Sequence, residues 1–301
     1  MLVIGGTLYG LDALGLIDLD EMAKSTNSKN TEKTTEKVKK EELIPIIDED
    51  GIDANLGIDL SNKQVGDCVA FGSYEQDNDF DNGKEPIDWV ILKIENEYAL
   101  LMSKYALDWE EIFYEYEPSV IRPDYHWSNS KIRETLNDTF YKEAFSDEEK
   151  NFILNTNVKT YGTRLSANPT EYEIDYSLRI TKDKIFLLSY TDVTNSLYGF
   201  GNSLEKKYNY TRVCEATEYA ARNAARHTTI IVTSYVDGVD YCLRSQGNDI
   251  EFGGRVRDKV NTTKYLSTLQ YVDGKGQLNP SGRGSNTYFI RPACIVKIVQ
   301  K

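Results

Sequence analysis

Strand-like and helical segments follow one another in blocks in this chain, and this order restricts its fold more than any other feature. Strands are predicted at residues 67–73, 87–95, 98–103 and 184–189, the second and third of which alternate apolar and polar residues. From Val239 onward, short strands separated by Gly-rich turns are expected. The segments 87–95 and 98–103 are joined by two polar residues and predict a hairpin. Because the blocks show no regular alternation of strand and helix, they predict an α+β fold and not a doubly wound parallel sheet.

The helical segments lie between the first strands and the last ones. Apolar residues at helical spacing predict helices at 128–137, 146–155 and 217–225. Ser128 or Asn129 is the expected N-cap of the first helix. Ser146, followed three residues later by Glu149, forms a capping box that predicts the start of the second helix.

Three regions of different composition divide the chain. Residues 1–20 are apolar, but Asp12 and Asp18 interrupt them, and they lack the basic start of a signal peptide. We interpret them as the outer end of an N-terminal membrane anchor; the alternative is a short amphipathic helix that packs on the domain. Residues 21–63 predict a polar linker and an extended lead-in, since the linker has too few apolar residues to fold. Residues 64–301 predict a single α+β domain that is long enough to bury a substantial core.

The chain is acidic, with a formal net charge of -13 and a pI near 4.8. Nucleic acid and anionic membrane surfaces repel such a charge unless basic residues cluster, and the sequence has no basic stripe. We therefore expect no nucleic-acid partner, and a membrane contact only through the N-terminal anchor. The 21 tyrosines suit half-buried strands and also recognition surfaces.

Candidate metal ligands are mostly acidic. Neither histidine has a Cys or a second His at ligand spacing, which disfavours zinc. Asp77, Asp79 and Asp81 have the spacing of a calcium loop, but the positions that an EF-hand fills with Gly and Glu hold Asn82 and Asp88. We keep two interpretations, a calcium site and a turn rich in Asp and Asn, and we expect no cofactor.

The four cysteines lie far apart in the sequence, and none forms a C-x-x-C pair. They are Cys68, Cys214, Cys242 and Cys294. Their even number permits two disulfides of unknown pairing, and the alternative is four mostly buried free thiols.

No recognisable catalytic motif is present, because the sequence contains no G-x-S-x-G, H-E-x-x-H or phosphate-binding loop. His126 stands beside Trp127, with no nucleophile or acid assigned to it. Arg244 and Arg291 follow apolar residues in strand-like segments, where a buried arginine must be paired. Each arginine either ties loops together or contacts an anion or a carbohydrate. An enzyme based on carboxylates or on His126 is also compatible with the sequence.

Four groups of segments together resemble one bacterial family of unknown function, which is common in gut Firmicutes. They are VGDCVAFGSYEQDNDFDNGKEPIDWVIL with YALLMSKYALD, HWSNSKIRETLNDTFYKEAFSDEEK, DKIFLLS with CEATEYA, and YCLRSQG with FIRPACIV. The hallmark of the family is W-x-L-R-S-P-G followed by V-R-P-A, and the resemblance covers residues 65–299. This chain departs from it where Gln246 replaces the Pro, and where Thr135 replaces a Trp in the helix motif S-x-L-R-x-W-L-N.

The family is itself distantly similar to the C-type-lectin-like fold, including the sulfatase-modifying type. This similarity implies small antiparallel sheets, two to three packed helices and long loops that often bind ligands. The enzymatic branch needs a closely spaced Cys pair that binds copper, whereas Cys242 and Cys294 lie far apart here. The Trp-Asn-Asp calcium signature of lectins is absent from the sequence as well.

The expected function is a non-catalytic binding module of the cell envelope or the extracellular space, with a glycan or a surface protein as partner. The candidate contacts, in or near loops at residues 109–127 and 248–285, are Trp127, His126, Tyr241, Arg244 and Arg291. One alternative is an enzyme acting on glycans or protein side chains, which predicts a pocket lined by His126, Arg244 and a carboxylate of raised pKa. The other alternative is a structural spacer or surface-layer component.

Overall fold

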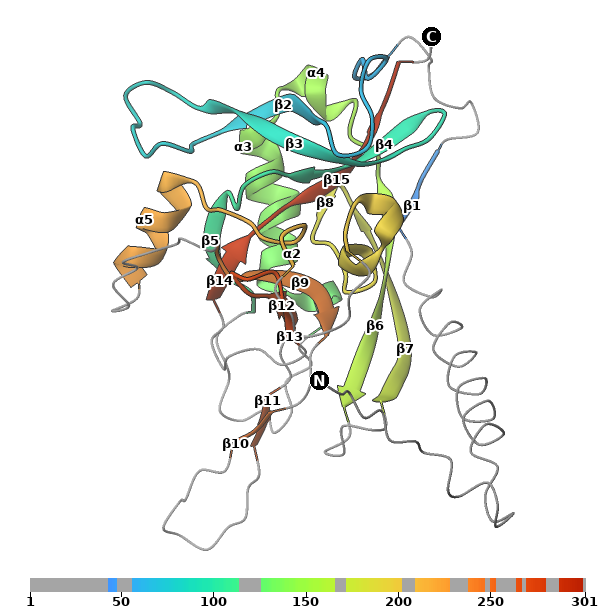
Figure 1. Cartoon of the computed structure of the whole chain (residues 1–301), viewed down its shortest axis with the longest axis vertical. Helices are drawn as coiled ribbons and strands as arrows, with labels where there is room; N and C mark the ends of the chain where they lie inside the picture. The colour runs from blue at the N-terminus through green and yellow to red at the C-terminus, as the bar shows by residue number, and fades with distance from the viewer. Residues whose placement is uncertain are drawn as a thin grey trace, which may run out of the picture. The chain divides into compact units, whose positions relative to one another are not determined.

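The structure of the chain is a computed structural model that describes residues 43–47, 56–113, 126–165, 172–201, 209–227, 238–246, 250–252, 264–266, 269–279 and 287–299 (Figure 1). All of these residues belong to Glu41–Lys301, one of the two units into which the chain divides. The predicted apolar segment 1–20 and most of the predicted linker 21–63 lie outside the described residues. In the part that is described, no helix is both long and apolar enough to cross a membrane.

The first sheet contains the predicted hairpin and the end of the chain. Its strands, in spatial order and each antiparallel to its neighbours, are β2 (Cys68–Tyr74), β3 (Glu85–Ile94), β4 (Tyr98–Ser103), β15 (Ala293–Lys297) and β8 (Ile185–Phe186). The amide of Glu95 donates to the carbonyl of Tyr98 over 2.8 Å and closes the β3–β4 hairpin, which confirms the prediction. The apolar run of β15 is buried, and the strand has a neighbour on each edge.

The second sheet is mixed. Its strands, in spatial order, are β13 (Leu278–Asn279), β12 (Leu269–Val272), β9 (Tyr241–Gln246), β14 (Thr287–Ile290) and β5 (Asp108–Glu111). β14 is parallel to β9 and antiparallel to β5. The short strands expected after Val239 are therefore present. β5 was not predicted, because its sequence Asp-Trp-Glu-Glu is short and polar.

The longest hairpin was not predicted from the sequence. It consists of β6 (Thr156–Leu165) and β7 (Tyr172–Asp183), and β1 (Leu43–Pro45) adds a third strand beside β6. β1 lies in the segment that was expected to be an extended lead-in. A separate pair is formed by β10 (Ile250–Phe252) and β11 (Lys264–Leu266).

The first predicted helix is present at the expected position, but its bounds differ from the prediction. It begins with a 3-10 turn, η2 (Trp127–Asn129), and continues as α2 (Lys131–Thr135), a π-helical turn η3 (Leu136–Phe140) and α3 (Tyr141–Ala144). The N-cap of α2 is Ser130 and not Ser128 or Asn129, because the Ser130 hydroxyl accepts the amide proton of Arg133.

The second predicted helix starts where expected and ends early. α4 (Asp147–Lys150) has the capping box of Ser146 and Glu149, which confirms that prediction. It stops before residue 155 because the chain turns toward β15, where the amide of Leu154 donates to the carbonyl of Ile295 over 2.8 Å. The third helix, α5 (Glu218–His227), agrees with the prediction to within two residues.

The predicted strand at 184–189 is reduced to the two residues of β8. The following residues lie next to other partners: the amide of Arg244 donates to the carbonyl of Leu188, and the Ser189 hydroxyl accepts the amide proton of Asp192, the first residue of a 3-10 turn, η4 (Asp192–Thr194). A second 3-10 turn, η5 (Ser196–Tyr198), follows directly.

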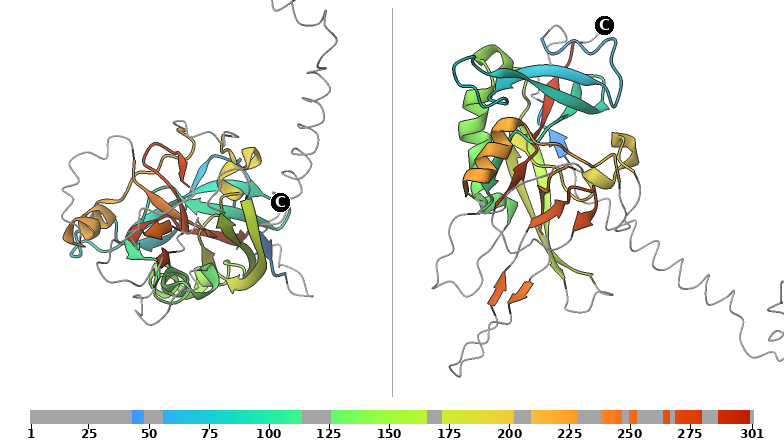
Figure 2. Two further views of the ribbon diagram at one scale, coloured as in Figure 1. Left: turned by 90° about the horizontal axis from the view of Figure 1, so that it is seen from below. Right: turned by 60° about the vertical axis from the view of Figure 1, so that its left-hand side comes forward.

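The run from α2 to α3 lies along one side of the two five-stranded sheets, and it contacts β5, β8 and β2 (Figures 1 and 2). The core between these layers includes Trp89, Trp127 and Phe145. Trp89 donates its indole proton to the carbonyl of Phe71 over 2.6 Å. Small antiparallel and mixed sheets with few helices make this an α+β fold, as expected from the order of segments.

Candidate functional site

The five side chains expected to contact a ligand all lie in the interior. They are His126, Trp127, Tyr241, Arg244 and Arg291, and each is at most 6% exposed. A ligand could reach them only if the protein opened. Their contacts within the chain are therefore described first, and the surface is described afterwards.

Arg244, on β9, forms a buried ion pair. Its Nη1 lies 2.6 Å from Oδ2 of Asp192 and donates to the carbonyl of Leu187 over 2.9 Å. The same Asp192 oxygen accepts the amide and hydroxyl protons of Ser189. The pair thus joins β9 to the loop after β8, which is the role expected of a structural arginine.

Arg291 and Tyr241 are brought together by the parallel pairing of β14 and β9. The Nε of Arg291 donates to the carbonyl of Ser103 over 2.9 Å, and its guanidinium carbon lies 5.3 Å from the centre of the Tyr241 ring. The Tyr241 hydroxyl donates to the carbonyl of Arg212 over 3.0 Å. Burial raises the pKa of Tyr241 to about 12, so the hydroxyl stays a donor at neutral pH.

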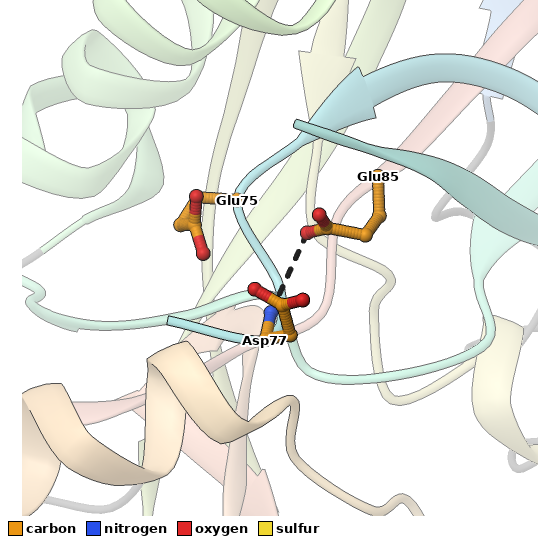
Figure 3. A group of neighbouring side chains, drawn as sticks. All are labelled: Glu75, Asp77 and Glu85. Carbon is orange, nitrogen blue, oxygen red and sulfur yellow. Dashed lines mark hydrogen bonds between the residues drawn. The ribbon is translucent and has the colours of Figure 1, made fainter. Parts of the chain in front are cut away.

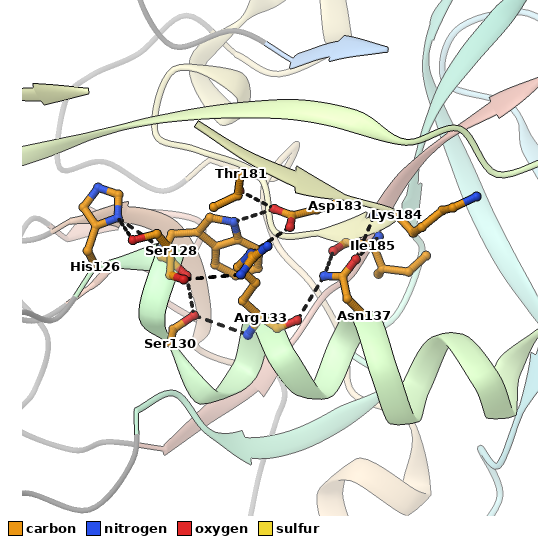
Figure 4. Close-up of polar contacts among 10 residues, drawn as sticks. His126, Ser128, Ser130, Arg133, Asn137, Thr181, Asp183, Lys184 and Ile185 are labelled. Carbon is orange, nitrogen blue, oxygen red and sulfur yellow. Dashed lines mark hydrogen bonds and ion pairs between the residues drawn. The ribbon is translucent and has the colours of Figure 1, made fainter. Parts of the chain in front are cut away.

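His126 and Trp127 belong to a polar network at the start of the helix (Figure 4). The buried carboxylate of Asp183 accepts hydrogen bonds from the Trp127 indole (2.9 Å), from Thr181 (2.6 Å) and from Nε of Arg133 (2.7 Å). The Nδ1 atom of His126 accepts the amide proton of Ser128 over 3.1 Å and caps η2. The network holds the helix against β7.

A second candidate region lies at the surface, in the loop between β2 and β3. We call residues 75–85 the Phe80 loop, and it lies beside α5 (Figure 1). Asp77 and Asp79 each accept the amide proton of the residue two positions on, which matches the predicted turn. The loop is tied to α5 by the amide of Tyr219, which donates to the carbonyl of Gln76 over 3.0 Å.

The expected calcium ligands are only partly grouped in this loop. Asp77 lies with Glu75 and Glu85, and one carboxylate oxygen from each of the three is within 4.8 Å of the others (Figure 3). Asp79 and Asp81 are not members of this group. The signal that could have identified Glu75 and Glu85 is the hairpin register, since Tyr74 pairs with Glu85 and so places both acids at the base of the loop.

Within this acidic group, the pKa values of Glu75 and Asp77 are shifted in opposite directions. Burial, and then the charge of Glu85, raise the pKa of Glu75. Hydrogen bonds from the Asn82 side chain and the Asp79 amide lower the pKa of Asp77. Asp77 is thus held as a carboxylate next to an acid that resists ionisation.

Phe80 is the exposed aromatic ring of the loop. Its side chain is 66% exposed, and its ring meets the ring of Tyr219 edge to face with centroids 6.1 Å apart. Tyr219 in turn packs edge to face on Tyr74, at 5.9 Å. An apolar ring is therefore held at the surface by a row of aromatic neighbours.

Asp108 is a buried carboxylate that the sequence analysis did not single out. It accepts hydrogen bonds from the Tyr74 hydroxyl, the Asn223 amide group and the amide of Trp109, each over 2.8 Å. Burial raises its pKa despite these bonds. A raised carboxylate pKa is a property of many acid catalysts and also of structural networks.

A cavity of about 740 Å³ lies between the turn after Leu60, the β3–β4 turn and Ile298. Neither His126 nor Arg244 lines it, so it differs from the pocket expected for an enzyme.

All four cysteines are free thiols. Cys214, Cys242 and Cys294 are buried, and burial raises the thiol pKa of each. Cys68 on β2 is partly exposed.

The model of a family described as a domain of unknown function, DUF6273, matches residues 96–298, which is more than half of the chain. The chain belongs to this family. No curated protein and no solved structure matches the chain. The matched part of the DUF6273 domain begins after β3, so the Phe80 loop precedes it, although β3 pairs with β4 in one sheet.

The matched region includes the arginines and the helix motif on which the resemblance was based. Ser130 caps α2, Arg133 pairs with Asp183, and Asn137 accepts the amide proton of Lys184 over 2.7 Å. Arg244 and Arg291 bond to neighbouring loops. In this DUF6273 domain, these residues all make contacts that hold elements together.

Proposed function

We propose that the protein is a non-catalytic binding module that acts outside the cytoplasm, and that its Phe80 loop binds a glycan. The observation that carries this proposal is Phe80, a large apolar side chain that is 66% exposed on a loop fixed by hydrogen bonds. Binding residues are often carried on surface loops that a rigid scaffold positions.

The chemistry around Phe80 favours a sugar. The apolar face of a sugar ring packs on an aromatic ring, and its hydroxyls donate to carboxylates. Asp77, Asp79 and Asp81 are in the same loop, and Asp77 and Asp79 are exposed. Because Asn82 and Glu85 hold the turn through hydrogen bonds with Asp77, a ligand meets a surface that is already ordered.

The finer expectations about fold and location are part of this proposal. Antiparallel sheets covered on one side by helices support a C-type-lectin-like topology, and superposition of an experimental structure on such domains tests it. A location in the cell envelope, with an N-terminal anchor and the linker 21–63 before the domain, rests on composition. Fractionation of the native host cells with an antibody against the domain tests the location.

The enzyme alternative has one specific observation in its favour. Asp108 combines a raised pKa with a hydrogen bond from Tyr74, as an acid catalyst would. Asp108 is 8% exposed, and it does not line the cavity described above. The binding module is therefore the function that the geometry supports better.

A glycan array with the purified full-length chain tests the proposal. We expect binding at micromolar concentrations to at least one glycan, and Phe80→Ala should weaken it about tenfold, the effect of losing roughly 1.4 kcal/mol. Tyr210→Ala is the matched control, since Tyr210 is an aromatic residue that is 80% exposed outside the loop. Absence of glycan binding, or equal effects of the two substitutions, would contradict the proposal.

A further inference from the structure

The base of the Phe80 loop brings three carboxylates together. Glu75 directly follows β2, Glu85 is the first residue of β3, and Asp77 lies between them in the loop (Figure 3). One oxygen from each lies within 4.8 Å of the others. Three like charges at this separation repel one another unless a positive charge or a proton lies among them.

Within the described part of the chain, no basic side chain supplies that positive charge. Among the described residues, none of the three acids has an ion pair with a lysine, arginine or histidine. The negative charge of the group is thus unbalanced within the part of the chain that the structure describes.

Two oxygen atoms of the loop are shut away from water without a hydrogen-bond donor. Glu75 is only 6% exposed, and its Oε1 has no hydrogen-bond partner in the described part of the chain. The same is true of Oδ1 of Asn78, a residue held at a left-handed φ of 63° beside Asp77. A buried acceptor without a partner destabilises the folded state, and more so when it is charged. Glu75, whose carboxylate belongs to the three-carboxylate group, therefore gains from a bound cation.

Three of the other carboxylate oxygens are fixed by hydrogen bonds. Oε2 of Glu85 accepts the amide protons of Gln76 (2.7 Å) and Asp77 (3.4 Å). Oδ1 and Oδ2 of Asp77 accept from the Asp79 amide and from the Asn82 side chain, each over 2.8 Å. These bonds orient the ligands before an ion arrives, and they leave lone pairs free for it.

The donor set selects the kind of cation. It consists of carboxylate oxygens, which suit calcium or magnesium and not zinc or copper. Magnesium usually keeps several waters and is held by one or two carboxylates, whereas calcium takes about 6–8 oxygen ligands. A group of three carboxylates therefore fits calcium better.

We propose that Glu75, Asp77 and Glu85 bind a calcium ion that fixes the base of the Phe80 loop. This set of ligands differs from the calcium loop considered from the sequence, which consists of Asp77, Asp79 and Asp81. Only Asp77 belongs to both sets. The inference goes beyond the proposed glycan binding and does not depend on it.

Calorimetric titration of the chelator-treated full-length chain with CaCl2 tests the site directly. We expect one ion per chain with a Kd of about 1 mM or lower, and an unfolding temperature that rises with CaCl2. Glu75→Gln and Asp77→Asn should each weaken binding at least about tenfold, because each removes a charged ligand. The matched controls are Asp79→Asn and Asp81→Asn, which remove the same charge from the same loop and should change the Kd by less than about twofold.

Several results would overturn the site. They are no heat and no change in unfolding temperature with CaCl2, equal loss of binding in the controls, or tighter binding of MgCl2 than of CaCl2. Should Glu75→Gln fail to fold by circular dichroism, Asp77→Asn and Glu85→Gln decide the assignment. Calcium binding without any glycan binding leaves this site standing and contradicts only the proposed function.

Discussion

Arg244 and Asp192 form the most buried of the ion pairs between described residues, with side chains 0% and 7% exposed. Asp192→Ala leaves the guanidinium charge in the interior, so we expect it to lower the free energy of unfolding by about 3–5 kcal/mol. The double substitution Asp192→Ala with Arg244→Met should lower the free energy of unfolding by less than Asp192→Ala alone, because it leaves no unpaired charge in the interior. Urea unfolding of the single and double variants measures this, and additive losses would contradict it.

Asp108 should make stability depend on pH. Its pKa is raised in the folded protein, so the folded state holds the proton more tightly than the unfolded state. This contribution to stability is present below the ordinary pKa of 3.8 and is lost as the pH rises through the folded pKa. Asp108→Asn should therefore flatten the fall in unfolding temperature as the pH rises above about 4. An unchanged pH profile in the variant would rule out this role of Asp108.

At the scale of the element, Asn137 joins the helix to β8. Its amide group donates to the carbonyls of Arg133 and Ile185, and its Oδ1 accepts the amide protons of Lys184 and Ile185. Asn137→Ala leaves these backbone groups without partners, and we expect a loss of about 2 kcal/mol in chemical denaturation.

The control for Asn137 is Thr139→Ala, an exposed position in the same π-helical turn. It should change the free energy of unfolding by less than about 0.5 kcal/mol. If both substitutions had the same effect, the bridge to β8 would not be the source of the stability.

At the scale of the whole molecule, the reactivity of the four thiols measures whether the core is closed to solvent. Only Cys68 should react with a thiol reagent in the native protein, since the other three are buried and their pKa values are raised. We expect the remaining thiols to react more than about tenfold slower, and all four to react at once in denaturant. Fast labelling of two or more thiols in the native protein would contradict the closed core.

Much of the candidate site could not be predicted from the sequence, because its residues come together only in the folded chain. The sequence pointed to Asp77 and to a turn, because Asp and Asn at two-residue spacing favour local hydrogen bonds. It did not point to Glu75 and Glu85, which come together only through the register of β2 with β3. The sequence did not distinguish Phe80 from the other aromatic residues, because its exposure depends on how α5 packs beside the loop.

Periodicity and capping residues by themselves determined the α+β class, the β3–β4 hairpin, the start of α4 and the position of α5, because each depends on residues close together in the chain. Only the tertiary structure decided the β6–β7 hairpin, the extent of the first helix, the burial of Arg244 and Arg291, and the grouping of Glu75 with Glu85. Those features depend on pairing between distant segments, as when β15 inserts between β4 and β8. A local pattern records which residues prefer to be buried, and the partner that buries them is set by the packing of the whole domain.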